Sequence, residues 1–171
     1  MVGEDLGPSL DPGALLGVLV RHGVDFVVIG GVAGLALGSS YPTYDLDVAY
    51  SRDAGNVKRL VAALKEVGVR LRGAPDDLPF VLDERTIENG ANFTFETEHG
   101  HFDVLAHVDG LSSYEALRRD SSVEEIAGHP VRVASIDHLI AMKHAANRTK
   151  DKLMLEEYIV LAEELDRQAS S

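Results

Sequence analysis

The chain has 171 residues, of which 45% are hydrophobic, and this is enough to bury a core within a single domain. The formal net charge of −12 argues against a general nucleic-acid coat, because such proteins neutralise phosphates with Lys and Arg. The absence of cysteine excludes disulfides and thiolate chemistry. Carboxylates, His or backbone oxygens must therefore hold any metal, and hard cations such as Mg²⁺ are favoured.

The N-terminal stretch MVGEDLGPSLDPG is acidic and rich in Pro and Gly. A secretory signal peptide has instead a basic segment followed by an apolar one. No run of the sequence approaches the ~20 apolar residues that span a bilayer. These features predict a cytoplasmic protein that makes no membrane contact.

Strand and helix patterns alternate in the first part of the chain. Apolar residues recur at helical spacing in two segments, which end at Gly23 and Gly68. Short apolar runs rich in β-branched residues indicate strands. The expected elements in chain order are helix 14–22, strand 25–30, helix 32–38, strand 45–50 and helix 56–68.

The remainder of the chain begins with β patterns and ends with helical ones. Ser135 and Thr149 are the expected N-caps of the last two helices. The expected elements are strand 69–72, an irregular segment 73–88, hairpin 91–108, helix 113–120, hairpin 124–134, helix 135–148 and helix 150–168. We therefore predict an α/β fold with a mixed sheet, in one domain of residues 1–171. Its core spans residues 14–108, and the mainly helical extension 109–171 packs on that core.

The strand at residues 45–50 carries two carboxylates on one face. Side chains alternate along a strand, so Asp45 and Asp47 point the same way, with Cα atoms about 7 Å apart. Two ionised carboxylates about 4 Å apart in a partly buried cleft repel by roughly 4 kcal/mol at an effective dielectric of 20. A divalent cation, a raised pKa of one Asp, or a nearby Arg would offset this repulsion. The alternative is an exposed strand face with no ligand.

Two further features point to the same place. Gly30-Gly31 lies where a strand turns into a helix, and backbone N–H groups at such a turn receive anions. Asp103 lies in the expected hairpin, and the three carboxylates form one cluster if its strand neighbours the strand of Asp45. Mg²⁺ would then bind triphosphate oxygens while Asp103 helps to orient an attacking hydroxyl. Close packing of helix on sheet is the alternative explanation of the glycines.

The stretch IGGVAGLALGSSYPTYDLDVAY resembles the opening motif of the nucleotidyltransferase superfamily related to polymerase β. The pattern Thr43-x-Asp45-x-Asp47, with the later LIAMKHAANRTKD, is similar to minimal nucleotidyltransferase-like proteins that include AbiEii-type toxins of toxin–antitoxin systems. The resemblance covers residues 28–151. It implies the nucleotidyltransferase fold and a transfer of NMP from an NTP to a hydroxyl acceptor, with Mg²⁺ or Mn²⁺ as cofactor. The sequence leaves the acceptor open among tRNA, protein and small molecules, and a cognate antitoxin is a candidate partner.

The resemblance also implies roles for single residues. The implied catalytic and metal-binding residues are Asp45, Asp47 and Asp103. Lys143 would neutralise phosphate charge, and Asp151 would support it. The implied nucleotide-binding residues are Gly30, Gly31, Ser39, Thr43, Lys143 and Asp151.

Two departures from the superfamily pattern favour a rival interpretation. Tyr41-Pro42 stands where many relatives carry a basic residue, and Gly31 replaces the serine of the Gly-Ser version. Both changes remove a phosphate contact. The rival is a catalytically inactive nucleotide- or protein-binding module of the same fold. A glycosyltransferase that binds a metal–sugar-nucleotide through Asp-x-Asp is disfavoured, because about one strand precedes the motif. His99 and His101 flank a turn glycine and are expected to be exposed at the hairpin tip.

Overall fold

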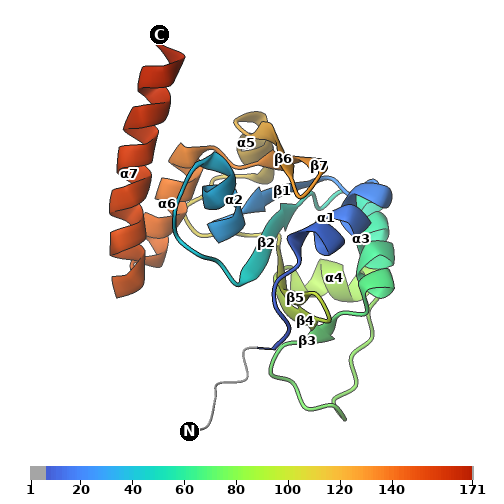
Figure 1. The fold of residues 1–171 in the computed structure, drawn as a ribbon. Helices are drawn as coiled ribbons and strands as arrows, with labels where there is room; N and C mark the ends of the chain where they lie inside the picture. The colour runs from blue at the N-terminus through green and yellow to red at the C-terminus, as the bar shows by residue number, and fades with distance from the viewer. Residues whose placement is uncertain (1–6, 171) are drawn as a thin grey trace, which may run out of the picture.

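A computed structural model describes residues 7–170, so residues 1–6 and 171 of the predicted domain lie outside it. Its strands form one seven-stranded sheet in the order β3-β4-β5-β2-β1-β7-β6 (Figure 1). β1 pairs antiparallel with β2 and parallel with β7, while β2 pairs parallel with β5. The predicted α/β class with a mixed sheet is therefore confirmed. The strands are β1 Phe26–Ile29, β2 Asp45–Tyr50, β3 Arg70–Leu71, β4 Phe93–Thr97, β5 Gly100–Leu105, β6 Ser122–Ile126 and β7 His129–Val133.

Helices lie on both sides of the sheet. α1, α3 and α4 lie together on one side, whereas α6 and α7 pack beside α2 on the other (Figure 1). Within the described residues, no helix has both the length and the apolar character needed to cross a membrane. The helices are α1 Pro12–Arg21, α2 Gly30–Leu37, α3 Ala54–Val67, α4 Glu84–Gly90, α5 Tyr114–Arg119, α6 Ile136–Ala146 and α7 Thr149–Ala169.

The core follows from the alternation of side chains along β2. Leu46, Val48 and Tyr50 are fully buried, and the Tyr50 hydroxyl donates to the carbonyl oxygen of Ala91, just beyond α4. Asp45 and Asp47 alternate with these residues and therefore point to the opposite side of the sheet, away from α4. This alternation leaves a polar strand face directly over a packed core.

Two elements differ from the sequence-based expectations. The segment 73–88 was expected to be irregular, but α4 begins at Glu84, after Asp83 accepts the backbone N–H of Thr86 at 2.8 Å. Only one turn of this short helix faces the core, through Ile87, so it has no helical periodicity to detect. Thr149 was expected to be the N-cap of α7 but is its first helical residue, because Arg148 occupies the cap position.

The hairpin β6–β7 extends the sheet of the core. Its residues belong to the expected C-terminal extension, yet β7 pairs with β1 through Val28 and Val133. The backbone N–H of Ala134 also donates to the carbonyl oxygen of Val28 at 3.0 Å. The sheet therefore continues beyond residue 108, and α6 and α7 make the helical part of the extension.

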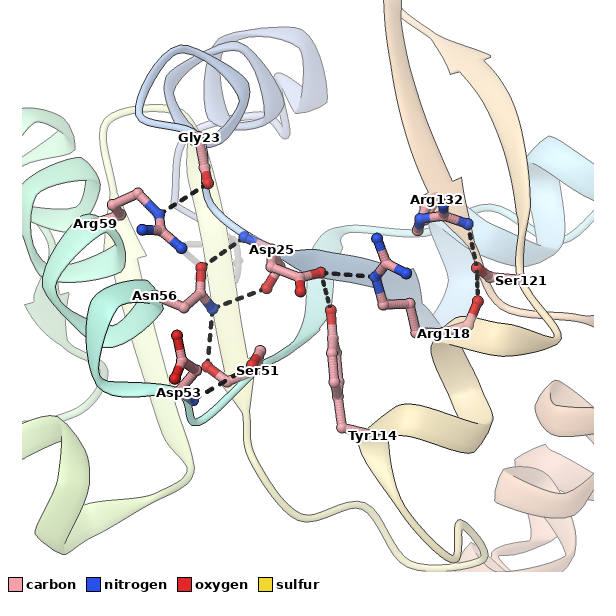
Figure 2. A network of polar contacts seen from close by, with 10 residues as sticks. All are labelled: Gly23, Asp25, Ser51, Asp53, Asn56, Arg59, Tyr114, Arg118, Ser121 and Arg132. Carbon is pink, nitrogen blue, oxygen red and sulfur yellow. Dashed lines mark hydrogen bonds and ion pairs between the residues drawn. The ribbon is translucent and has the colours of Figure 1, made fainter.

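A polar network holds the start of β1 in place (Figure 2). The Asn56 side chain of α3 accepts the backbone N–H of Asp25 at 2.6 Å and donates to the carbonyl oxygen of Ser51 at 2.8 Å. Tyr114 of α5 donates to the Asp25 carboxylate at 2.6 Å, and Arg118 donates to it at 3.2 Å. Burial, with the nearby Asp25, raises the pKa of Tyr114 and keeps its hydroxyl protonated. β1 is therefore fixed at the end opposite to the glycine turn.

Candidate active site

Three carboxylates lie side by side on adjacent strands. In the parallel pair of β2 and β5, Asp47 is opposite Asp103 and Asp45 is opposite His101. The strands of Asp45 and Asp103 are therefore neighbours in the sheet, as the hypothesis of a three-carboxylate cluster requires. We call Asp45, Asp47 and Asp103 the carboxylate cluster.

Burial and mutual repulsion disfavour the ionised forms of two members of the carboxylate cluster. Burial, followed by the charges of Asp103 and Asp45, raises the pKa of Asp47 to about 7. Burial also raises the pKa of Asp103, although the Arg72 guanidinium opposes the change. A cation bound by the carboxylates would stabilise their ionised forms.

Two basic side chains contact the carboxylate cluster. Arg72, just after β3, has its Nη2 atom 2.6 Å from Oδ1 of Asp103. His101 has its Nδ1 atom 3.4 Å from Oδ1 of Asp45, and 30% of its side chain is exposed. His101 therefore lies in the site, whereas hairpin-tip exposure was expected for it. Sequence reasoning missed both contacts, because each joins residues far apart in the chain and depends on the strand register.

The glycine turn packs directly against the carboxylate cluster. Gly30 begins α2 with a φ of +69°, and a Cβ atom there would lie 2.2 Å from Oδ2 of Asp47. A Cβ atom on Gly31 would lie 2.6 Å from Oγ1 of Thr43, which donates to the carbonyl oxygen of Asp45 at 3.2 Å. Both positions require glycine for the close approach of α2 to β2. The helix N-terminus, with its unpaired N–H groups, thus lies beside Asp47.

A cavity of about 200 Å³ opens between Asp47 and the C-terminal helices. Its polar lining includes Lys143 and Arg148, whereas its apolar lining comes from β1, α6 and Val108. Tyr158 also lines the cavity, and within the described residues its buried hydroxyl has no hydrogen-bond partner. Burial, with the charges of Glu157 and Asp151, raises the pKa of Tyr158 to about 12. The cavity therefore combines an apolar wall with cations and an unpaired hydroxyl.

Asp151 holds the two cations of this cavity. Its carboxylate is 1% exposed and accepts from Nζ of Lys143 at 3.0 Å and from Nε of Arg148 at 2.7 Å. Burial by itself would raise its pKa, but the hydrogen bonds from Arg148 and Lys143 outweigh burial and lower the pKa of Asp151 to about 2. Asp151 is therefore ionised at neutral pH and fixes Lys143 on the same cavity as Asp47.

Ser39 lies away from the other predicted nucleotide-binding residues. It follows α2, whose eight residues at 1.5 Å per residue give the helix a length of about 12 Å from its start at Gly30. Its buried hydroxyl accepts a hydrogen bond from the backbone N–H of Tyr41 at 3.2 Å. Its own backbone N–H donates to the carbonyl oxygen of Gly34. The structure thus brings Gly30, Gly31 and Thr43 to the carboxylate cluster, and it brings Lys143 to the cavity beside it, but it places Ser39 at the C-terminal end of α2.

The side chains as placed do not form a complete metal site. Within the described residues, no group of three or more His, Asp or Glu side chains is arranged to hold a metal ion. Arg72 engages one oxygen of Asp103, so this carboxylate is committed to a protein cation. Asp45 and Asp47 still suit Mg²⁺, since proteins bind this ion through one or two carboxylates together with substrate phosphates and water.

No protein-family model and no curated protein matches the chain. Solved structures do match it in fold. The antibiotic-resistance factor ANT(2'')-Ia, in complex with adenylyl-2''-tobramycin, has a TM-score of 0.57 and 19% identity, over 89% of this chain and 86% of its own. The lincomycin-bound lincosamide antibiotic adenylyltransferase LnuA has a TM-score of 0.58 and 11% identity, over 90% and 99%.

A third similar structure is the candidate nucleotidyltransferase TM1012 from Thermotoga maritima. Its TM-score is 0.53 at 12% identity, over 89% of this chain and 96% of its own. At these identities the likeness concerns the fold. The chain therefore adopts the nucleotidyltransferase fold, as the sequence predicted.

Proposed function

We propose that the protein is a Mg²⁺-dependent nucleotidyltransferase that transfers an NMP group from an NTP to a hydroxyl acceptor. The observation that carries this proposal is the position of the carboxylate cluster against the glycine turn. Asp45 and Asp47 would hold the cation, and the N–H groups at Gly30 and Gly31 would bind triphosphate oxygens. The fold shared with LnuA and ANT(2'')-Ia supports the same reaction class.

The proposed reaction is an in-line displacement at the α-phosphorus. The acceptor oxygen forms a bond to this phosphorus, and the bond to the oxygen that bridges to the β-phosphorus breaks, so pyrophosphate leaves. Asp103 receives the proton of the acceptor hydroxyl. Lys143 faces the cavity next to Asp47 and would neutralise charge on the leaving phosphates. Bound Mg²⁺ would supply further stabilisation of the phosphate charge.

The acceptor that we propose is a hydroxyl of a tRNA or a protein. A role as the toxin of a toxin–antitoxin pair, with a cognate antitoxin as partner, belongs to the same proposal. Two of the structures similar in fold were solved with a modified or a bound antibiotic, so a small-molecule hydroxyl is the alternative acceptor class. A cytoplasmic location is part of this proposal too.

Calorimetric titration of each NTP tests the nucleotide site. We expect binding of one NTP to the unmodified protein in the presence of Mg²⁺, and binding at least about tenfold weaker without Mg²⁺ or in Asp47→Asn, since a charged contact is worth about 1.5–3 kcal/mol. Asp53→Asn is the matched control, because Asp53 is an exposed residue that follows β2 and lies outside the carboxylate cluster. Equal affinity in Asp47→Asn and Asp53→Asn would contradict the assignment.

The rival function is a catalytically inactive binding module of the same fold. Tyr41-Pro42, in place of a basic residue before Thr43, favours this alternative. It predicts tight binding of a nucleotide or of a protein partner, but no release of pyrophosphate with any acceptor. Titration therefore tests for a nucleotide ligand, and a transfer assay distinguishes the enzyme from the module.

A further inference from the structure

Arg72 occupies the side of the carboxylate cluster opposite to Lys143. Its Nη2 atom donates to Oδ1 of Asp103 at 2.6 Å and to the carbonyl oxygen of Phe95 at 2.8 Å. Its side chain is 26% exposed and that of Asp103 is 16% exposed, so this ion pair is largely shielded from water. A shielded pair with a short contact keeps more of its Coulomb energy than a surface pair does.

The backbone holds the Arg72 guanidinium in place. The backbone N–H of Arg72 donates to the carbonyl oxygen of Thr94 at 3.0 Å, and Thr94 is the cross-strand partner of Asp103. The Nε atom of Arg72 is buried and, within the described residues, has no hydrogen-bond partner. The charge therefore stays beside Asp103 through two anchors, one on β4 and one on β5.

The other two carboxylates are free of such a cation. Within the described residues, neither Asp45 nor Asp47 forms an ion pair with an arginine or a lysine. Both negative charges would attract a divalent ion bound by Asp45 and Asp47. A second divalent ion at Asp103 would lie next to a fixed guanidinium, and the repulsion between these like charges would weaken its binding.

We propose that Arg72 takes the place of a second metal ion, so that the carboxylate cluster holds a single divalent cation, at Asp45 and Asp47. Arg72 is a positioning residue in this proposal: it fixes Asp103 on the acceptor side and excludes a second cation from it. The inference rests on the proposed nucleotidyltransferase function. It adds the metal count and a role for Arg72, a residue that sequence patterns did not single out.

The test is a Mn²⁺ titration followed by electron paramagnetic resonance, with a saturating non-hydrolysable NTP analogue. The count per chain is corrected for Mn²⁺ bound to free analogue. We expect one Mn²⁺ per chain for the unmodified protein. In Arg72→Gln we expect a second Mn²⁺ to bind. Its affinity should be at least about tenfold higher than that of any second Mn²⁺ in the unmodified protein, because the fixed charge of Arg72 no longer repels it.

Arg70→Gln is the matched control. Arg70 lies on β3, two residues before Arg72, but its partner is Glu96 at 3.7 Å and its side chain is 69% exposed. The control removes the same charge from β3 without touching Asp103, so we expect one Mn²⁺ per chain. A purely structural role of Arg72 would lower the melting temperature without creating a Mn²⁺ site.

Two outcomes overturn the inference alone. One is a count of two Mn²⁺ with similar affinities in the unmodified protein, and the other is an unchanged count and affinity in Arg72→Gln. The first measurement needs no variant, so it decides the question even if Arg72→Gln does not fold. A protein that binds neither Mn²⁺ nor the analogue would instead overturn the proposed function together with the inference.

Discussion

Gly30 shows how one residue couples the fold to the candidate site. Its φ of +69° lies in the left-handed region, which costs other residues about 1–2 kcal/mol. A side chain at this position would also collide with the Asp47 carboxylate, because its Cβ atom would lie 2.2 Å from Oδ2. Gly30 therefore serves two purposes, since it turns the chain from β1 into α2 and leaves room for a carboxylate of the cluster.

A pair of glycine substitutions separates these two purposes. Gly30→Ala and Gly68→Ala both place a Cβ atom at positive φ, but nothing lies within 4 Å of that atom at Gly68. We expect Gly68→Ala to lower the free energy of unfolding by about 1–2 kcal/mol and to leave NTP binding unchanged. We expect Gly30→Ala to lose more stability and, because Asp47 must move, at least about tenfold in Mg²⁺–NTP affinity. Denaturant unfolding and calorimetry measure the two effects. Equal NTP affinity in both variants would contradict the role given to Gly30.

The position of a residue in the carboxylate cluster was predictable from the sequence only where local strand geometry determines it. Strand alternation places Asp45 and Asp47 on one face whatever the sheet order, so the sequence predicts this pair. The position of Asp103 opposite Asp47 depends on β2 pairing with β5, which no local pattern determines. Arg72 reaches Asp103 from just after β3, a strand two positions from β5 in the sheet, and this contact was not predictable for the same reason.

At the scale of elements, the turn between α6 and α7 organises the cations of the cavity. Asp151 accepts the backbone N–H of Arg148 at 3.2 Å, which caps the first turn of α7. The same carboxylate accepts from Lys143 near the end of α6. One buried carboxylate thus joins two helices and sets the direction of Lys143.

Asp151→Asn tests this organisation through the pH dependence of stability. The folded-state pKa of Asp151, about 2, lies below the ordinary value of 3.8. Ionised Asp151 therefore contributes stability above about pH 4, and this contribution is lost as the pH falls towards 2. We expect Asp151→Asn to cost about 2 kcal/mol at pH 7 and progressively less below pH 4. Denaturant unfolding at several pH values measures this difference.

Glu164→Gln is the control for this pH series, because Glu164 is exposed on the same helix. We expect its free energy of unfolding to stay within about 0.5 kcal/mol of that of the unmodified protein. A constant cost of Asp151→Asn from pH 7 to pH 2.5 would show that the carboxylate charge of Asp151 does not stabilise the turn.

Helices with a clear apolar periodicity were predictable from the sequence. Short helices and strand pairings between distant segments were less predictable. The apolar stripe of α3 matches its buried residues Val57, Leu60 and Leu64, and Ser135 caps α6 as expected by accepting the N–H of His138. α4 has a single buried residue and hence no stripe. The hairpin β6–β7 was predicted as a local pair, but its addition to the core sheet follows from the parallel pairing of β7 with β1, which lies about 100 residues earlier.

At the scale of the whole molecule, the candidate site lies where the sheet meets the C-terminal helices. The carboxylate cluster comes from β2 and β5, the glycine turn from α2, and the cations Lys143 and Arg148 from α6 and the turn before α7. The polar network of Asp25 fixes the other end of β1 (Figure 2). This separation puts the site at the other end of β1, with its cavity lined by α6, which packs on α2.

The measurement that tests the proposed function most directly is transfer of label from each α-³²P-labelled NTP. Tobramycin and lincomycin, total tRNA and a cell-protein fraction serve as acceptors, with pyrophosphate measured in parallel. We expect one acceptor class to gain label with release of one pyrophosphate per transfer, and we expect Asp47→Asn to abolish transfer while Asp53→Asn does not. Mg²⁺-dependent NTP binding without label transfer or pyrophosphate release with any acceptor would contradict the proposed transferase and identify a binding module.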